Sequence, residues 1–225
     1  MAKLYFKYGV MGSSKSAQAL MCRFNYVEKG FNVLLIKSNI DTRDMKDNNI
    51  VIKSRIGLSE KCEVINKNDD LYKFVKDKGY LNEKSVVIVD EAQFLTKQQV
   101  EQLKEVSTKT PVLCYGLLTN FKTELFEGSK RLVEIADSLQ ELKSVCRCGN
   151  KANTNGRFIN GKLVTDGDEI MIGGNDTYEA LCYHCYTKLK EKSKQSENNK
   201  ETAKHKARKV KDYVSKIDKG AENER

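Results

Sequence analysis

The segment from Gly9 to Ser16 constrains the fold of this chain more than any other feature. Residues 3–8 before it alternate in polarity and are rich in aromatic side chains, which predicts a β-strand. Residues 15–28 at its end carry apolar side chains at helical spacing, with Ala19 and Leu20 on the apolar face. A strand that turns through two glycines directly into a helix is typical of an α/β protein.

The turn itself reads Gly-Val-Met-Gly-Ser-Ser-Lys-Ser and follows the pattern G-x-x-x-x-G-K-[ST] with one departure. In such a loop, backbone N–H groups at a helix N-terminus hold phosphate oxygens. The residues predicted to bind the phosphates of ATP are Gly9, Val10, Met11, Gly12, Ser13, Ser14, Lys15 and Ser16.

Within this loop, Lys15 is expected to neutralise the β- and γ-phosphates, and the Ser16 hydroxyl to bind Mg²⁺. Ser14 stands where the pattern has its second glycine, a residue that turns the backbone without a Cβ atom. A strained turn or weaker nucleotide binding would follow. The alternative interpretation is a polar strand-to-helix turn in which Lys15 and Ser16 occur by chance.

Two acidic residues, Asp90 and Glu91, directly follow the apolar β-branched run Val86–Val89. A continuous run of this kind is typical of a central parallel strand. Ligands of open α/β sheets bind at the carboxyl ends of the strands, so both acids are expected beside the phosphate loop. Asp90 would bind the metal and Glu91 would accept a proton from the attacking hydroxyl. The alternative is a pair of solvated acids that cap the next helix.

Further strand patterns at residues 32–36 and 111–115 alternate with helical patterns at 71–75 and 97–105. We therefore predict a P-loop (RecA-like) parallel sheet flanked by helices over residues 1–143. Cysteines, glycines and short polar turns dominate residues 144–190, which we interpret as a second, smaller domain. Residues 191–225 hold 11 basic and 7 acidic side chains with few large apolar ones, which predicts a disordered tail.

Four of the seven cysteines form two close pairs in the smaller unit. A C-x-C pair followed by a C-x-x-C pair suits tetrahedral Zn²⁺, and four protein ligands leave no open position for catalysis. The predicted ligands of this structural zinc are Cys146, Cys148, Cys182 and Cys185. The alternative is four reduced thiols, since an odd number of cysteines argues against a disulfide framework.

Composition excludes several classes of protein. No apolar run reaches the roughly 20 residues of a membrane helix, and the N-terminus shows no signal peptide, so we expect a cytoplasmic protein without a membrane partner. Of the net charge of +9, about +4 lies in residues 191–225, where 11 basic side chains face 7 acidic ones, and the remaining charge is spread over the rest of the chain. Because the basic residues form no stripe with interleaved aromatics, the charge disfavours nucleic acid as a partner.

Several motifs, taken in order and spacing, resemble the type II (cellular and bacterial) thymidine kinases from about residue 3 to residue 190. Besides the phosphate loop, they occupy residues 37–43, 54–58, 90–94, 115–117, 124–126 and 172–178. The resemblance implies transfer of the γ-phosphate of ATP to the 5′-hydroxyl of thymidine or deoxyuridine, giving dTMP from thymidine. It also implies a structural zinc, a homotetramer and inhibition by the triphosphate end product.

The resemblance implies roles for particular residues as well. Glu91 matches the catalytic base, and Phe121 matches the aromatic side chain that contacts thymine. A loop called the lasso, which closes over the nucleoside, is matched by Glu169, Ile170, Met171, Ile172, Gly173 and Tyr178. On the ATP side, the matching residues are Asp41, Arg43, Asp90 and Gln93.

The sequence departs from the family at two further positions: Leu118 stands where the family usually has Arg, and Asn120 replaces an Asp. Two lost charges near the substrate put rate and affinity in question without altering the expected fold. We therefore keep two alternatives to an active nucleoside kinase. One is a zinc-containing P-loop ATPase that acts on nucleic acid, and the other is a catalytically weakened homologue.

Overall fold

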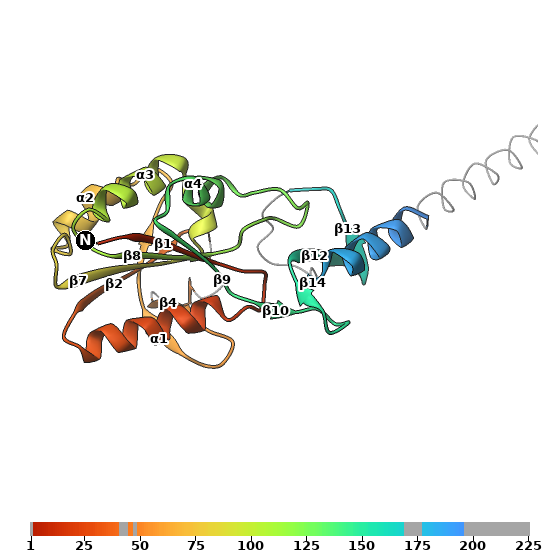
Figure 1. Ribbon diagram of the computed structural model, residues 1–225, viewed down its shortest axis with the longest axis horizontal. Coiled ribbons are helices and arrows are strands. Elements are labelled where there is room, and N and C mark those ends of the chain that lie inside the picture. The colour runs from red at the N-terminus through yellow and green to blue at the C-terminus, as the bar shows by residue number, and fades with distance from the viewer. Residues whose placement is uncertain (1, 41–44, 47–48, 169–176, 196–225) are drawn as a thin grey trace, which may run out of the picture.

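A parallel β-sheet forms the centre of the protein in this computed structural model, which describes residues 2–40, 45–46, 49–168 and 177–195. Its strand order is β6-β2-β7-β8-β1-β9, and every neighbouring pair runs parallel (Figure 1). The strands are β1 (Leu4–Tyr8), β2 (Asn32–Ser38), β6 (Glu63–Ile65), β7 (Ser85–Asp90), β8 (Val112–Gly116) and β9 (Ser138–Glu141). Their carboxyl ends therefore share one edge.

Helices cover both faces of this sheet, with α1 on one side and α2, α3 and α4 on the other (Figure 1). The bounds are α1 (Lys15–Glu28), α2 (Leu71–Asp77), α3 (Lys97–Val106) and α4 (Glu127–Ile135), with a short 3-10 helix η1 (Ala92–Phe94). The predicted α/β fold with a parallel sheet flanked by helices is confirmed. The predicted ends of the elements differ from the observed ones by one or two residues, as is usual at frayed ends.

The burial of strand β7 explains why the run Val86–Val89 is apolar throughout. All six residues of β7 are buried, because helices cover both faces of the sheet. Val87 and Val89 pack with Leu103 of α3, whereas Val86 and Ile88 pack with the α1 side of the core. Successive side chains of a strand point to opposite faces, so one uninterrupted β-branched run serves both cores.

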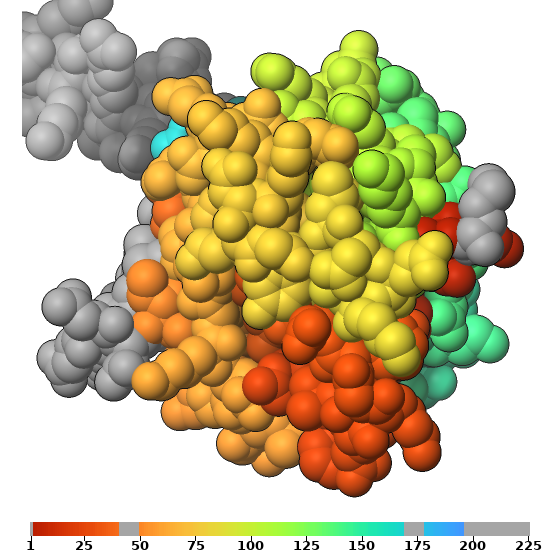
Figure 2. Space-filling view, turned by 90° about the vertical axis from the view of Figure 1, so that its left-hand side faces the viewer, coloured from red at the N-terminus to blue at the C-terminus, as the bar shows by residue number. Residues whose placement is uncertain are grey.

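An antiparallel three-stranded meander that the sequence patterns did not predict follows β2 and is here called the hairpin. It contains β3 (Met45–Lys46), β4 (Asn49–Lys53) and β5 (Ser59–Lys61). Arg23 of α1 forms an ion pair of 3.0 Å with Glu60 of β5, and the segment around residues 50–61 lies against α1 in the space-filling view (Figure 2). This contact joins the hairpin to α1.

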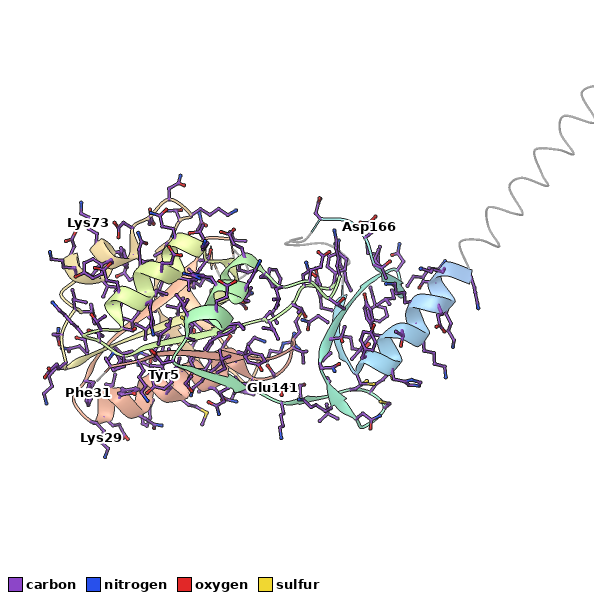
Figure 3. All side chains as sticks on the ribbon, turned by 45° about the horizontal axis from the view of Figure 1, so that its top comes forward. Tyr5, Lys29, Phe31, Lys73, Glu141 and Asp166 are labelled. Carbon is purple, nitrogen blue, oxygen red and sulfur yellow. The ribbon has the colours of Figure 1, made fainter. Side chains whose placement is uncertain are left out.

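The remaining strands lie beyond the end of the main sheet (Figures 1 and 3). They are β10 (Ser144–Val145), β11 (Lys151–Ala152), β12 (Thr154–Ile159), β13 (Lys162–Val164) and β14 (Thr177–Leu181), and residues 183–195 are helical. These elements, here called the small region, have a separate core that also takes in Val10 of the phosphate loop. The domain boundaries at residues 143 and 190 stay predictions; the helix passes the second by five residues, and residues 196–225 lie outside the described part.

No helix in the described ranges combines the length and apolar character that a membrane crossing requires.

A glycine in α4 generates a stability prediction. A Cβ atom on Gly128 would stand 2.6 Å from the carbonyl oxygen of Leu95 and 2.7 Å from that of Ala92, both in or beside η1. Although Gly→Ala usually stabilises a helix by about 1 kcal/mol, we expect Gly128→Ala to destabilise the protein by about 1–3 kcal/mol. Chemical denaturation measures this, with exposed Lys130→Ala in the same helix as the control. A stabilised Gly128→Ala variant would contradict the packing.

Candidate active site

A cleft of ≈ 610 Å³ opens at the carboxyl edge of the sheet. It is lined by the phosphate loop, by Asp90 and Glu91 at the end of β7, and by residues 53–57 of the hairpin. The structure thus brings together the two segments on which the sequence-based prediction of a kinase depends. Helix α1 begins in the cleft, so its N-terminal N–H groups and dipole favour an anion there.

The glycines of the loop are required by close approach and by backbone conformation. A Cβ on Gly9 would stand 2.4 Å from Ser13 Oγ and 2.5 Å from the Leu142 carbonyl oxygen. Gly12 has a φ of 74°, and Ser14 has φ 60° and ψ 25°, both in the left-handed region. The serine occupies the conformation that the pattern reserves for glycine, at a cost of about 1–2 kcal/mol.

Lys15 is buried with its ammonium group held by the loop. Its Nζ donates hydrogen bonds to the carbonyl oxygens of Val10 at 2.8 Å and Gly9 at 3.3 Å. These contacts hold a positive charge at the cleft, where the side chain is 8% exposed. The lysine is therefore placed before any anion arrives.

Asp90 combines burial with an unpaired oxygen. Burial, followed by the nearby Glu91 carboxylate, raises the pKa of Asp90 to about 7, while a hydrogen bond with the Ser16 side chain opposes the rise. Within the described residues, Asp90 Oδ1 has no hydrogen-bond partner. A buried carboxylate oxygen without a donor, next to a serine hydroxyl, is a donor set that fits Mg²⁺, which prefers oxygen ligands.

Glu91 lies at the cleft with a strained backbone, at φ 52° and ψ 39°. The buried side chain of Gln93 holds it, because Gln93 Nε2 donates a hydrogen bond to Glu91 Oε2. Gln93 Oε1 in turn accepts the N–H of Leu117 at 2.9 Å, directly after β8. Gln93, which the family resemblance assigns to the ATP side, therefore fixes the carboxylate of Glu91 in this structure.

Phe121 is 1% exposed and lies between the main sheet and the small region. The Arg157 guanidinium lies 5.1 Å from its ring centroid, and the Tyr186 hydroxyl donates a hydrogen bond of 3.0 Å to the Phe121 carbonyl oxygen. Tyr178 is half-buried on β14, where it pairs with Arg157.

The other residues expected at the nucleoside and the phosphates lie outside the described residues: Asp41, Arg43, Glu169, Ile170, Met171, Ile172 and Gly173.

Several side chains at the site escaped the sequence-based prediction. Lys37 and Arg55 line the cleft; they fall in the motifs at residues 37–43 and 54–58 but were given no role. Asn155 and Arg157 of β12 are almost completely buried. Lys37 offers a signal in retrospect, since a lysine at the carboxyl end of an apolar strand has to serve a polar site or a cleft. Asn155 and Arg157 offer none, because they belong to no motif and only tertiary packing brings them here.

The four cysteines of the small region converge. Their sulfur atoms all lie within 4.8 Å of one another, with Cys146 and Cys148 at the β10–β11 turn and Cys182 and Cys185 before and inside the last helix. A hydrogen bond from the Asn150 backbone lowers the pKa of the Cys148 thiol to about 6, which favours thiolate. Four sulfur donors in this arrangement fit a tetrahedral zinc ion with no open position.

The parallel sheet, the phosphate loop and the acidic strand end define a P-loop nucleotide-binding protein. A family model described as thymidine kinase matches residues 2–186, and the chain belongs to this family. Similar proteins named thymidine kinase include those of Pasteurella multocida, 47% identical over 81% of this chain and 95% of its own length, and Legionella pneumophila, 46% identical over 81% and 88%. That of Shewanella oneidensis is 43% identical over 81% and 95%.

These matches confirm the resemblance to thymidine kinases and the prediction of a kinase. They do not favour the alternative of an ATPase that acts on nucleic acid.

The cysteine cluster generates a prediction about metal content. We expect the native protein to hold one zinc ion, and Cys148→Ser to lose it and to melt at a lower temperature, because structural zinc contributes directly to folding. Metal analysis and thermal denaturation measure both effects. Cys62→Ser, a half-buried cysteine outside the cluster, is the control and should keep its zinc. Full zinc occupancy in Cys148→Ser would remove that sulfur from the ligand set.

Proposed function

We propose that this protein transfers the γ-phosphate of ATP to the 5′-hydroxyl of thymidine, and also of deoxyuridine, forming the nucleoside monophosphate and ADP. The observation that carries this proposal is the shared cleft of the phosphate loop and Glu91. The names of the family and of the relatives support thymidine as the acceptor.

The donor side is built from the phosphate loop and the end of β7. Loop N–H groups at the start of α1 hold phosphate oxygens, and Lys15 balances their charge. Asp90 and Ser16 would hold Mg²⁺, which supplies charge neutralisation between the phosphates. Asp41 and Arg43 are proposed for the same side on the family resemblance, where the arginine would stabilise transferring charge.

On the acceptor side, Glu91 accepts the proton of the 5′-hydroxyl while that oxygen forms a bond to the γ-phosphorus and the bond to ADP breaks. The hydrogen bond from Gln93 keeps the carboxylate aimed into the cleft. Phe121 contacts the thymine ring, and the lasso residues Glu169–Gly173 with Tyr178 close over the nucleoside. These roles rest on the family resemblance.

We also propose a structural metal, a cellular compartment and an oligomeric state for this protein. The four cysteines hold structural zinc, and the protein acts in the cytoplasm. A homotetramer is proposed on the family resemblance, and an interface between copies is supported by exposed apolar side chains of α1, namely Met21 at 55%, Phe24 at 58% and Val27 at 46% exposure. A stripe of this kind is typical of a surface that another chain covers.

Replacement of the proposed base tests the reaction. Glu91→Gln should lower kcat by about 10²–10⁴-fold, because a positioned general base contributes that much, while ATP binding changes little. Steady-state assays with thymidine and titration with a non-hydrolysable ATP analogue separate the two effects. Glu105→Gln, on the exposed face of α3, is the matched control. Full turnover in Glu91→Gln would take Glu91 out of its proposed role.

The serine in the phosphate loop tests whether the protein is weakened. We expect the native protein to phosphorylate thymidine, and Ser14→Gly to raise the free energy of unfolding by about 0.5–1 kcal/mol, since relief of left-handed strain exceeds the added chain entropy. Ser14→Ala keeps the Cβ and should not be stabilised. Activity that appears only in Ser14→Gly would instead identify a loop impaired by its serine.

A further inference from the structure

Strand β12 of the small region carries a polar side chain that reaches into the main part of the protein. Asn155 is 2% exposed, and its side-chain amide makes two hydrogen bonds to backbone groups. Its Oδ1 accepts the N–H of Met11 at 2.8 Å, and its Nδ2 donates to the Thr119 carbonyl oxygen at 3.0 Å. One side chain therefore joins β12, the phosphate loop and the segment after β8.

The phosphate loop depends on the small region for part of its support. Gly9 is tied to the sheet by its N–H, which donates to Gly116 at 3.2 Å. The next two residues turn to the other side: Val10 packs in the core of the small region together with Cys146 and Cys182, and Met11 donates to Asn155. The phosphate loop is therefore bonded to the main sheet at Gly9 and packed against the core of the small region at Val10.

The same strand also supports the residue proposed to contact thymine. Arg157 follows Asn155 by two positions, which puts both side chains on one face of β12. Its guanidinium lies against the Phe121 ring, two residues beyond Thr119. One face of one strand therefore contacts both the loop for the phosphate donor and the aromatic side chain for the acceptor.

We propose that Asn155 is a positioning residue that couples the small region to the phosphate loop. By holding the Met11 N–H and the Thr119 carbonyl at once, it keeps the loop in its phosphate-binding shape and at a set distance from the nucleoside site. Asn155 acts through the loop and does not contact the triphosphate. This inference rests on the proposal that ATP binds at the loop, and small displacements there are costly because phosphoryl transfer depends on alignment.

The test compares Asn155→Ala with Asn155→Leu, which keeps the bulk of the side chain but removes both hydrogen bonds. Asn153→Ala is the control, since Asn153 lies exposed on the same chain segment two residues earlier. Calorimetry measures two dissociation constants from the protein, that of β,γ-imido-ATP in the presence of Mg²⁺ and that of thymidine. We expect the analogue to bind about tenfold more weakly in both variants, because the Met11 N–H loses the acceptor that holds the loop, and thymidine to bind within about twofold of native.

Two further measurements separate positioning from general damage. Metal analysis should show native zinc content in both variants. Hydrogen exchange of the segment 9–16 should be faster than native without nucleotide and should slow again when the analogue binds. The value of kcat should fall by about tenfold or more, since misaligned groups react slowly.

Native affinity for the analogue in folded, zinc-bearing variants would overturn the inference, and so would weaker thymidine binding with unchanged analogue binding, which would make Asn155 a nucleoside contact. If Asn155→Leu bound the analogue with native affinity while Asn155→Ala did not, the loss would be due to side-chain volume and not to the hydrogen bonds, which would also overturn the inference. If neither variant folds, the native protein decides: a Met11 amide that exchanges as fast as an exposed one overturns the proposal. Failure of native protein to bind the analogue would instead refute the proposed function.

Discussion

The parallel register of β1, β8 and β7 is the constraint on which the rest of the site depends. Tyr8 at the end of β1 lies beside Gly116 of β8, and Cys114 of β8 lies beside Val89 of β7. The turns that follow β1 and β7 therefore leave the sheet at one edge, and an anion-binding loop faces two carboxylates. Because the side chains of a strand alternate between faces, a one-residue shift of register would move each β7 side chain to the opposite face and take Asp90 away from the phosphate loop.

Two residues with strained backbone lie at this edge. Ser14 and Glu91 both adopt left-handed backbone conformations, which cost about 1–3 kcal/mol each, and Asp90 is buried with an unpaired oxygen. Such costs persist only where the surroundings determine them. Here Gln93 ties Glu91 to the end of β8, while the packed strand β7 holds Asp90 in place. Ser14 and Glu91 are thus two of the four non-glycine residues with left-handed φ in the described chain, and both lie at the cleft; Thr123 and Asn160 are the other two.

The small region also contacts the phosphate loop. Its cysteine cluster, its core and the side chain of Asn155 form a continuous path of contacts to Val10 and Met11 of the phosphate loop. A short, weakly apolar segment of this size buries too little surface to fold firmly without a metal. A zinc ion at the cysteine cluster would therefore also stabilise the phosphate loop, through contacts that cross from one core to the other.

Local patterns in the sequence determined the parallel α/β fold, the phosphate loop, the acidic strand end and the four cysteines, since each rests on residues close together in the chain or on a strict spacing. The same patterns placed β1, α1, β2, β7, α3 and β8 within two residues of their observed ends. Tertiary structure alone decided three other features: the antiparallel hairpin, the hydrogen bond from Gln93 to Glu91, and the contacts of Asn155 and Arg157. They join segments such as Met11 and Asn155 that are 144 residues apart, and no local spacing records a hydrogen bond that only the packing of two cores brings within reach.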